Sequence, residues 1–227
     1  MHRLATAIFG SAVITVSVLS AGSNQVDSAA RNCLNLYAKG NIEALSKVAR
    51  QSSSFKSRLF AAYLLYRRNP KQYRSNFIQA LPKGEKQYIA YVSIPSNLVV
   101  DEGSETYEVS MKGVPWPISF WEIHTAACKM AREGNRTCIR SVLALSRFGD
   151  GEIGEGMGED ASRLFGTPAT VAKHWDLFQT HIDLLPGMSD DFSPAQVEKI
   201  KQGYIVAFST DQATLNRILE LIEKGKR

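Results

Sequence analysis

The sequence contains no motif that by itself identifies a catalysed reaction. It has no metal-ligand spacing, no activated nucleophile and no phosphate-binding glycine loop. Among its four histidines, His174 and His181 are seven residues apart, about 10 Å along a helix, which is too far for one metal ion. No Ser/His/Asp or Cys/His set can be assembled from it either. The sequence therefore predicts no cofactor and no metal site, and it favours a protein that binds over one that catalyses.

Cysteine is scarce, with only Cys33, Cys128 and Cys138 in the chain. In an oxidising compartment, two of three cysteines can pair. A helix that ends near Gly134 and a second that begins after Asn135 would place Cys128 and Cys138 opposite each other in a helical hairpin. We therefore expect a Cys128–Cys138 disulfide, with two buried thiols as the alternative, and a buried Cys33.

Long apolar runs are absent except at the N-terminus. A short positive end, Met1 to Arg3, precedes an apolar run from Leu4 to Leu19 and then the small residues of 20–23. This order is typical of a secretory signal peptide, and the run falls short of the roughly 20 residues that a spanning helix needs. We expect residues 1–23 to be removed and the mature chain to be periplasmic or extracellular, without a transmembrane span. A retained N-terminal anchor is the alternative.

Acidic residues are missing from Gln51 to Gly84, a stretch that carries seven basic ones. Four of these surround one predicted helix junction: Arg67, Arg68, Lys71 and Arg74. They predict a positive patch for a protein partner or an anionic component of the cell envelope. An ordinary solvated surface of two helices is the alternative. Because the chain is expected to be exported, nucleic acid is not an expected partner.

Apolar residues recur with helical spacing almost everywhere after the signal. The stripe that begins at Phe55 predicts one helix, and Asn69 followed by Pro70 predicts the cap and first residue of the next. Thr167 and Pro168 open a helix expected to run as far as Ile182. Near the C-terminus, two segments have the capping-box pattern, in which a serine caps the helix and a glutamine follows three residues later. They are Ser193 to Gln196 and Ser209 to Gln212.

These patterns predict an all-α protein made of stacked helical hairpins, either a HEAT-like array or a compact helical bundle. Prolines and glycines concentrate between Ile94 and Pro117, where a short β-hairpin or an irregular segment is expected, with a short helix from Ser104 as the alternative. The predicted organisation is therefore a signal at 1–23, an N-terminal helical lobe at 24–94, an irregular connector at 95–117 and a C-terminal helical lobe at 118–227.

The segment from Asp150 to Asp160 has five acidic residues, four glycines and no base. As a loop it would resemble a calcium site, but the acids do not have EF-hand spacing. As a helix it would place Glu152, Glu155 and Glu159 on one face and glycines on a neighbouring one. We favour the helix. Four glycines cost roughly 1 kcal/mol each relative to alanine, so close packing or a ligand must compensate.

Glu122 lies between Trp121 and Ile123. An apolar setting could make this carboxyl a general acid for cleavage of cell-wall glycan, with the aromatic rings binding sugar. No partner carboxylate can be identified, and Glu122 fits equally well on the wet face of an amphipathic helix.

The favoured function is an exported, non-enzymatic helical binding or scaffold protein whose partner the sequence does not name. Its expected surfaces are the basic junction at Arg67 to Arg74 and the acidic helix at Glu152 to Glu159. The alternatives are a secreted cell-wall glycan hydrolase that uses Glu122 and an envelope-resident inhibitor or immunity protein.

Overall fold

The computed structural model describes residues 28–94, 120–149 and 151–225, and within them the protein is all helical, without strands. The predicted signal peptide and the predicted connector both lie outside the described residues. The elements, in chain order, are α1 (Ser28–Ala38), α2 (Ile42–Gln51), α3 (Phe55–Arg68), α4 (Pro70–Ala80), α5 (Glu85–Val92), α7 (Phe120–Arg132), α8 (Arg136–Leu145), α9 (Gly151–Arg163), η1 (Leu164–Gly166), α10 (Pro168–Lys173), α11 (Trp175–Phe178), η2 (Gln179–Leu184), α12 (Met188–Asp191), α13 (Pro194–Ala207) and α14 (Gln212–Lys224).

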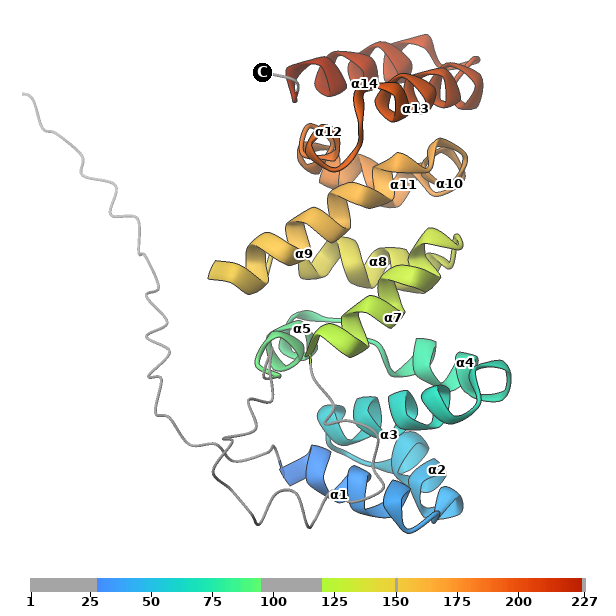
Figure 1. Ribbon diagram of the computed structural model, residues 1–227, viewed down its shortest axis with the longest axis vertical. Helices are drawn as coiled ribbons and strands as arrows, with labels where there is room; N and C mark the ends of the chain where they lie inside the picture. Colours follow the sequence, from blue (N-terminus) through green and yellow to red (C-terminus); the bar gives the residue numbers. More distant parts are fainter. Residues whose placement is uncertain (1–27, 95–119, 150, 226–227) are drawn as a thin grey trace, which may run out of the picture.

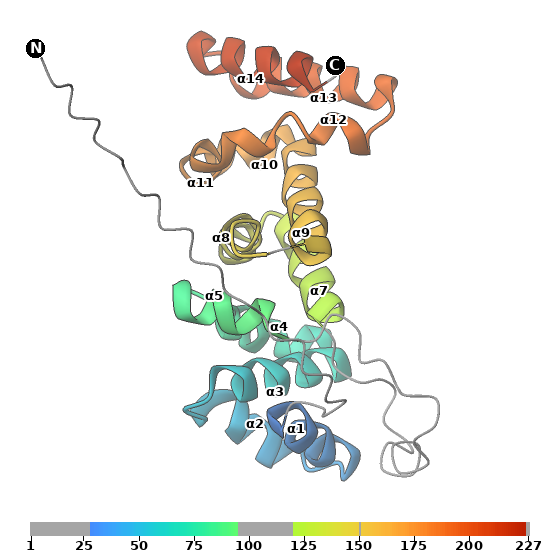
Figure 2. The same cartoon turned by 90° about the vertical axis from the view of Figure 1, so that its left-hand side faces the viewer.

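The helices form an extended stack that runs from α1 and α2 at one end to α13 and α14 at the other (Figure 1). Many helices pack against near neighbours in the chain, most closely in the pairs α2 with α3, α3 with α4 and α7 with α8, whereas α10 and α13 pack mainly against each other. The same order along one axis is visible after a quarter turn (Figure 2). The prediction of an all-α protein of stacked helical hairpins is thus confirmed. No helix of the described residues is long and apolar enough to cross a membrane.

The hairpin of α3 and α4 follows from local signals that the sequence carries openly. Asn69 ends α3, and its side chain accepts a 3.1 Å hydrogen bond from the amide of Gln72, which caps α4 at Pro70. The rings of Tyr66 and Phe77 then stack across the hairpin with centroids 5.2 Å apart. The helix predicted from Phe55 and the cap predicted at Asn69 are both confirmed.

Aromatic contacts join α5 to the helices that follow the predicted connector. The ring of Tyr91 meets Phe120 of α7 edge-on at 5.2 Å, and the ring of Tyr88 stacks on Phe148, just after α8, at 5.1 Å. Tyr91 and Phe120 are fully buried. One continuous apolar core therefore runs through the stack.

The turn between α7 and α8 has the predicted position but not the predicted disulfide. Gly134 adopts φ +84°, and the Asn135 side chain caps α8 by accepting a 3.1 Å hydrogen bond from the Cys138 amide. No disulfide forms among the described residues, and all three cysteines are buried thiols. The Cys128 sulfur lies 3.4 Å from Nε2 of His124, within its own helix, and forms no bond to Cys138. The expected bridge is therefore wrong for this structure.

Two further expectations need correction in the C-terminal part. The single helix predicted from Pro168 is interrupted at His174, where the backbone leaves helical geometry at φ −122° and ψ 31°, and it continues as α11 and the 3-10 helix η2. The cap of α14 is Asp211 and not Ser209, because the Asp211 carboxylate accepts the hydrogen bond from the Thr214 amide. The predicted capping box of Ser193 and Gln196 is present at α13.

Candidate functional site

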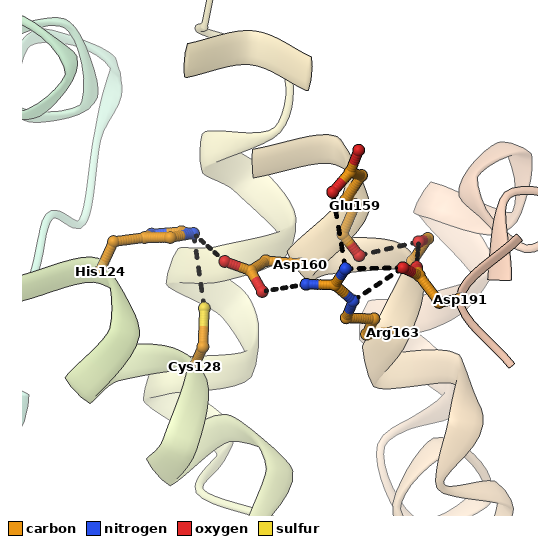
Figure 3. A network of polar contacts seen from close by, with 7 residues as sticks. His124, Cys128, Glu159, Asp160, Arg163 and Asp191 are labelled. Carbon is orange, nitrogen blue, oxygen red and sulfur yellow. Dashed lines mark hydrogen bonds and ion pairs between the residues drawn. The ribbon is translucent and has the colours of Figure 1, made fainter. Parts of the chain in front are cut away.

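A chain of polar side chains crosses the middle of the stack, where sequence-distant helices meet (Figure 3). It begins on α7 with His124 and Cys128 and continues on α9 with Asp160 and Arg163. It ends at Asp191 on α12, whose carboxylate is 2.7 Å from the Arg163 guanidinium. This network contains the only potential metal-ligand cluster found in the described residues.

The glycines of α9 allow this helix to sit close to its neighbours. A Cβ atom at Gly154 would lie 2.8 Å from the main chain of Gly149, and one at Gly156 would lie 2.5 Å from the ring of Trp121 on α7. Gly158, in contrast, has nothing within 4 Å of where its Cβ would be. The helical interpretation of this segment is confirmed, and the calcium-loop alternative is wrong. Close packing compensates for glycine at two positions of the helix.

The imidazole of His124 is fixed by aromatic rings on several sides. It stacks on Phe120 at 5.3 Å and meets Trp121 and Tyr91 edge-on at 5.9 and 6.5 Å. Its Nε2 atom lies 3.4 Å from the Cys128 sulfur and 3.4 Å from Oδ2 of Asp160. His124 is fully buried, and the Asp160 side chain is 18% exposed. Nitrogen, sulfur and oxygen ligand atoms thus converge on one point between α7 and α9.

Burial and charge set the protonation of this cluster. Burial, followed by the negative charge of Asp160, raises the pKa of the Cys128 thiol well above its ordinary value. For Asp160, burial alone would raise the pKa, but the hydrogen bond with His124 and the charges of His124 and Arg163 outweigh it, so the pKa is lowered. Around neutral pH, the site therefore holds a thiol beside a carboxylate.

This arrangement does not fit nucleophilic catalysis. A cysteine nucleophile needs an exposed thiolate of lowered pKa, whereas Cys128 is 2% exposed and its pKa is raised. In a catalytic triad, the nucleophile and the acid contact different nitrogens of the histidine. Here, both Cys128 and Asp160 face Nε2 of His124. The arrangement therefore differs from that of a catalytic triad.

Arg163 holds the other end of the network together. Its Nε and Nη2 atoms donate to Oδ1 of Asp191 at 2.9 and 2.7 Å, and its Nη1 donates to Oδ1 of Asp160 at 3.4 Å. The Ser162 hydroxyl adds a 3.3 Å hydrogen bond to Asp191. A pocket of about 500 Å³ opens beside these groups, and its polar lining combines Arg163 with the carboxylates of Glu159, Asp183, Asp190 and Asp191.

The residues of the expected basic patch divide into two kinds. Arg67 lies 3.5 Å from Glu122, and Arg74 lies 2.6 Å from Glu133, so both hold the α3–α4 hairpin to α7. Arg68 and Lys71 are exposed at the junction of α3 and α4. The structure therefore leaves two of the four cations turned to solvent.

The acidic residues of the sequence prediction differ in their contacts. Glu155 is exposed on α9, Glu159 contacts Arg163 at 3.5 Å, and the side chain of Glu152 lies outside the described residues. Glu122 lies 3.5 Å from Arg67 and so belongs to an ion pair between α7 and α3. That contact gives no support to a catalytic role for Glu122.

Sequence reasoning missed the cluster of His124, Cys128 and Asp160. One signal was present, since His124 and Cys128 are four residues apart and must share a face of any helix that contains both. The third residue is 32 positions from Cys128, and only the packing of α9 on α7 brings it close. The histidines that were considered lie elsewhere: His174 contacts the Gly134 carbonyl at 3.2 Å, and His181 contacts the Leu177 carbonyl at 3.2 Å.

Comparison with known proteins gave no match for this chain among protein-family models, curated proteins or solved structures.

Proposed function

We propose that this protein is an exported, non-enzymatic helical scaffold that binds a partner protein. The observation that supports the proposal is the packing of its helical pairs against sequence neighbours in an extended stack (Figures 1 and 2). An extended stack of helices exposes long continuous faces. Helical arrays commonly bind proteins along such faces.

The partner is proposed to be acidic where it meets the junction of α3 and α4. Arg68 and Lys71 are exposed there, and the whole stretch from Gln51 to Gly84 lacks acids that could neutralise them locally. Arg67 and Arg74 add positive charge nearby, although each also has a carboxylate partner on α7. Attraction between opposite charges would act mainly on the association rate and on the choice of partner.

Affinity capture tests this proposal. The full chain is immobilised, incubated with the envelope fraction of its native cell, and the retained proteins are identified by mass spectrometry. The test variant is Arg68→Glu with Lys71→Glu. The matched control is Lys173→Glu with Lys199→Glu, which makes the same charge change at exposed positions on α10 and α13. We expect the wild type and the control to retain one acidic protein that the test variant does not retain. The difference in retention should grow as the salt concentration is lowered.

One outcome would contradict the proposed surface, and another would contradict the proposed partner. Retention of the same protein by all three chains would remove the α3–α4 junction from the interface. Retention of anionic lipid or wall polymer without any protein would replace the partner by an envelope component. Cell fractionation tests export separately, since the proposal requires a product outside the cytoplasm that is shorter than the full chain by intact mass.

A further inference from the structure

The ligand atoms of His124, Cys128 and Asp160 form the most specific chemical group in the described part of the chain. All three lie within 4.8 Å of one another. Cys128 and Asp160 are each 3.4 Å from the same nitrogen, Nε2 of His124. In tetrahedral zinc sites, metal–ligand bonds of about 2.0 to 2.3 Å place neighbouring ligand atoms roughly 3.3 to 3.6 Å apart. The separations from Nε2 of His124 to the other two ligand atoms have this length, and the three atoms together lie within 4.8 Å.

We propose that His124, Cys128 and Asp160 bind a divalent transition metal ion, with Zn²⁺ as the best fit, between α7 and α9. The nitrogen, sulfur and oxygen donors suit this ion, which accepts imidazole, thiolate and carboxylate together. Calcium and magnesium prefer sites made entirely of oxygen, so a buried sulfur and nitrogen disfavour them. Three protein ligands leave a fourth position of the tetrahedron for water or another small ligand.

Charge balance supports the same ion. A thiolate and a carboxylate carry two negative charges, which a divalent cation neutralises in a place where His124 is fully buried and Cys128 is 2% exposed. Cysteine binds a metal ion as the thiolate and not as the thiol. The ion therefore replaces the thiol proton, and binding weakens as the pH falls.

The surroundings hold the ligands in place. His124 and Cys128 are one turn apart on α7, and aromatic rings fix the His124 imidazole. Arg163 contacts Oδ1 of Asp160, which leaves Oδ2 directed at His124. Arg163 is itself held by Asp191 (Figure 3). Arg163 is thus a positioning residue that orients a ligand from the outer shell, as such partners do in many metal sites.

Cobalt titration of the full chain tests the site. The protein is stripped with a chelator, kept reduced and titrated with Co²⁺, which reports a thiolate ligand by a charge-transfer band in the near ultraviolet and tetrahedral geometry by intense visible bands. We expect one Co²⁺ per chain, full displacement by one equivalent of Zn²⁺ and release of a proton on binding. Cys128→Ser should abolish the charge-transfer band, whereas Cys33→Ser and Cys138→Ser should keep it.

Two more variants keep the test decisive if Cys128→Ser does not fold, as judged by circular dichroism. Asp160→Asn changes a partly exposed side chain without changing its size, and it should weaken Zn²⁺ binding by more than about tenfold. Arg163→Gln should weaken binding by about 10- to 100-fold and leave the band in place, because the thiolate remains. The proposal is overturned if the stripped wild type shows no charge-transfer band with Co²⁺, or if the band depends on Cys33 or Cys138 and not on Cys128.

Discussion

The hydroxyl of Tyr204 donates a 2.6 Å hydrogen bond to the main-chain carbonyl of Phe165. Both residues are fully buried, and 39 positions of sequence separate them. The bond joins α13 to η1 at the point where Gly203 also packs against the ring of Pro168. It therefore fixes the last helical pair to the rest of the stack.

Removal of this hydroxyl in Tyr204→Phe should lower the free energy of unfolding by about 1 to 3 kcal/mol, because the Phe165 carbonyl is then buried without its donor. Urea denaturation followed by circular dichroism measures the change. Tyr73→Phe, at a half-buried tyrosine of α4, is the control and should stay within about 0.5 kcal/mol of the wild type. Equal effects of the two variants would contradict the assigned role of the bond.

Two glycines of α9 should respond to alanine with opposite sign. Gly158→Ala should raise the free energy of unfolding by up to about 1 kcal/mol, because alanine favours helix and nothing lies within 4 Å of the new methyl group. Gly154→Ala should lower it by about 1 to 3 kcal/mol, since the methyl group would lie 2.8 Å from the main chain of Gly149. Denaturation midpoints of the two variants give the comparison. A stabilising Gly154→Ala would show that α9 does not approach Gly149 so closely.

The ion pair of Arg163 and Asp191 should be worth more than a surface pair. The Asp191 side chain is 12% exposed and that of Arg163 is 39% exposed, so we expect a coupling energy of about 1 kcal/mol from a double-mutant cycle with Arg163→Met and Asp191→Asn. The control cycle uses Glu220 and Lys224 on α14, where both side chains are more than half exposed. That pair should give about 0.3 to 0.5 kcal/mol. A coupling at Arg163 no larger than the control would mean that the network does not hold α12 to α9.

All three cysteines should be unreactive in the folded protein and reactive after unfolding. Burial keeps Cys33, Cys128 and Cys138 away from reagent, and it raises the pKa of Cys138 to about 12. Ellman's reagent at pH 8 without reductant should therefore detect no thiol in the native chain and three in guanidinium chloride. A single reactive thiol in the denatured chain would show that two of the three cysteines form a disulfide, as expected for Cys128 and Cys138.

The stability of the protein should fall in alkaline solution, partly through Cys138. The folded-state pKa of this thiol is about 12, above its ordinary value of 9.0, because burial disfavours the charged form. A raised pKa means that the stability from the neutral thiol is fully present below about pH 9 and is lost as the pH rises towards 12. Urea denaturation at several pH values should show a shallower decline for Cys138→Ala than for the wild type. Tyr63, whose pKa burial raises to about 12, continues to contribute in both chains.

The starts of the helices were predicted well because each helix cap depends on a few adjacent residues. Asn69 and Pro70 mark the start of α4, Asn135 marks the start of α8, and Ser193 with Gln196 marks α13. The cap of α14 was predicted wrongly at Ser209, because the capping-box spacing to Gln212 pointed there, whereas Asp211 is the cap. The break at His174 had no local signal at all.

The candidate site was harder to predict because it depends on which faces of distant helices meet. Arg67 and Arg74 looked like a free basic surface, since their partners Glu122 and Glu133 lie more than 50 positions away. Asp160 was grouped with neighbouring acids as part of an acidic helix, yet the structure turns it towards His124. Charge along the sequence therefore located charged residues without showing which of them are neutralised inside the fold.

The stacking of helices along one axis also has a mechanical consequence. A small change of angle at one junction moves everything beyond it, and such changes add up from α1 to α14. The contacts from His124 to Asp191 join α7, α9 and α12 in the middle of the stack, so they oppose such changes there.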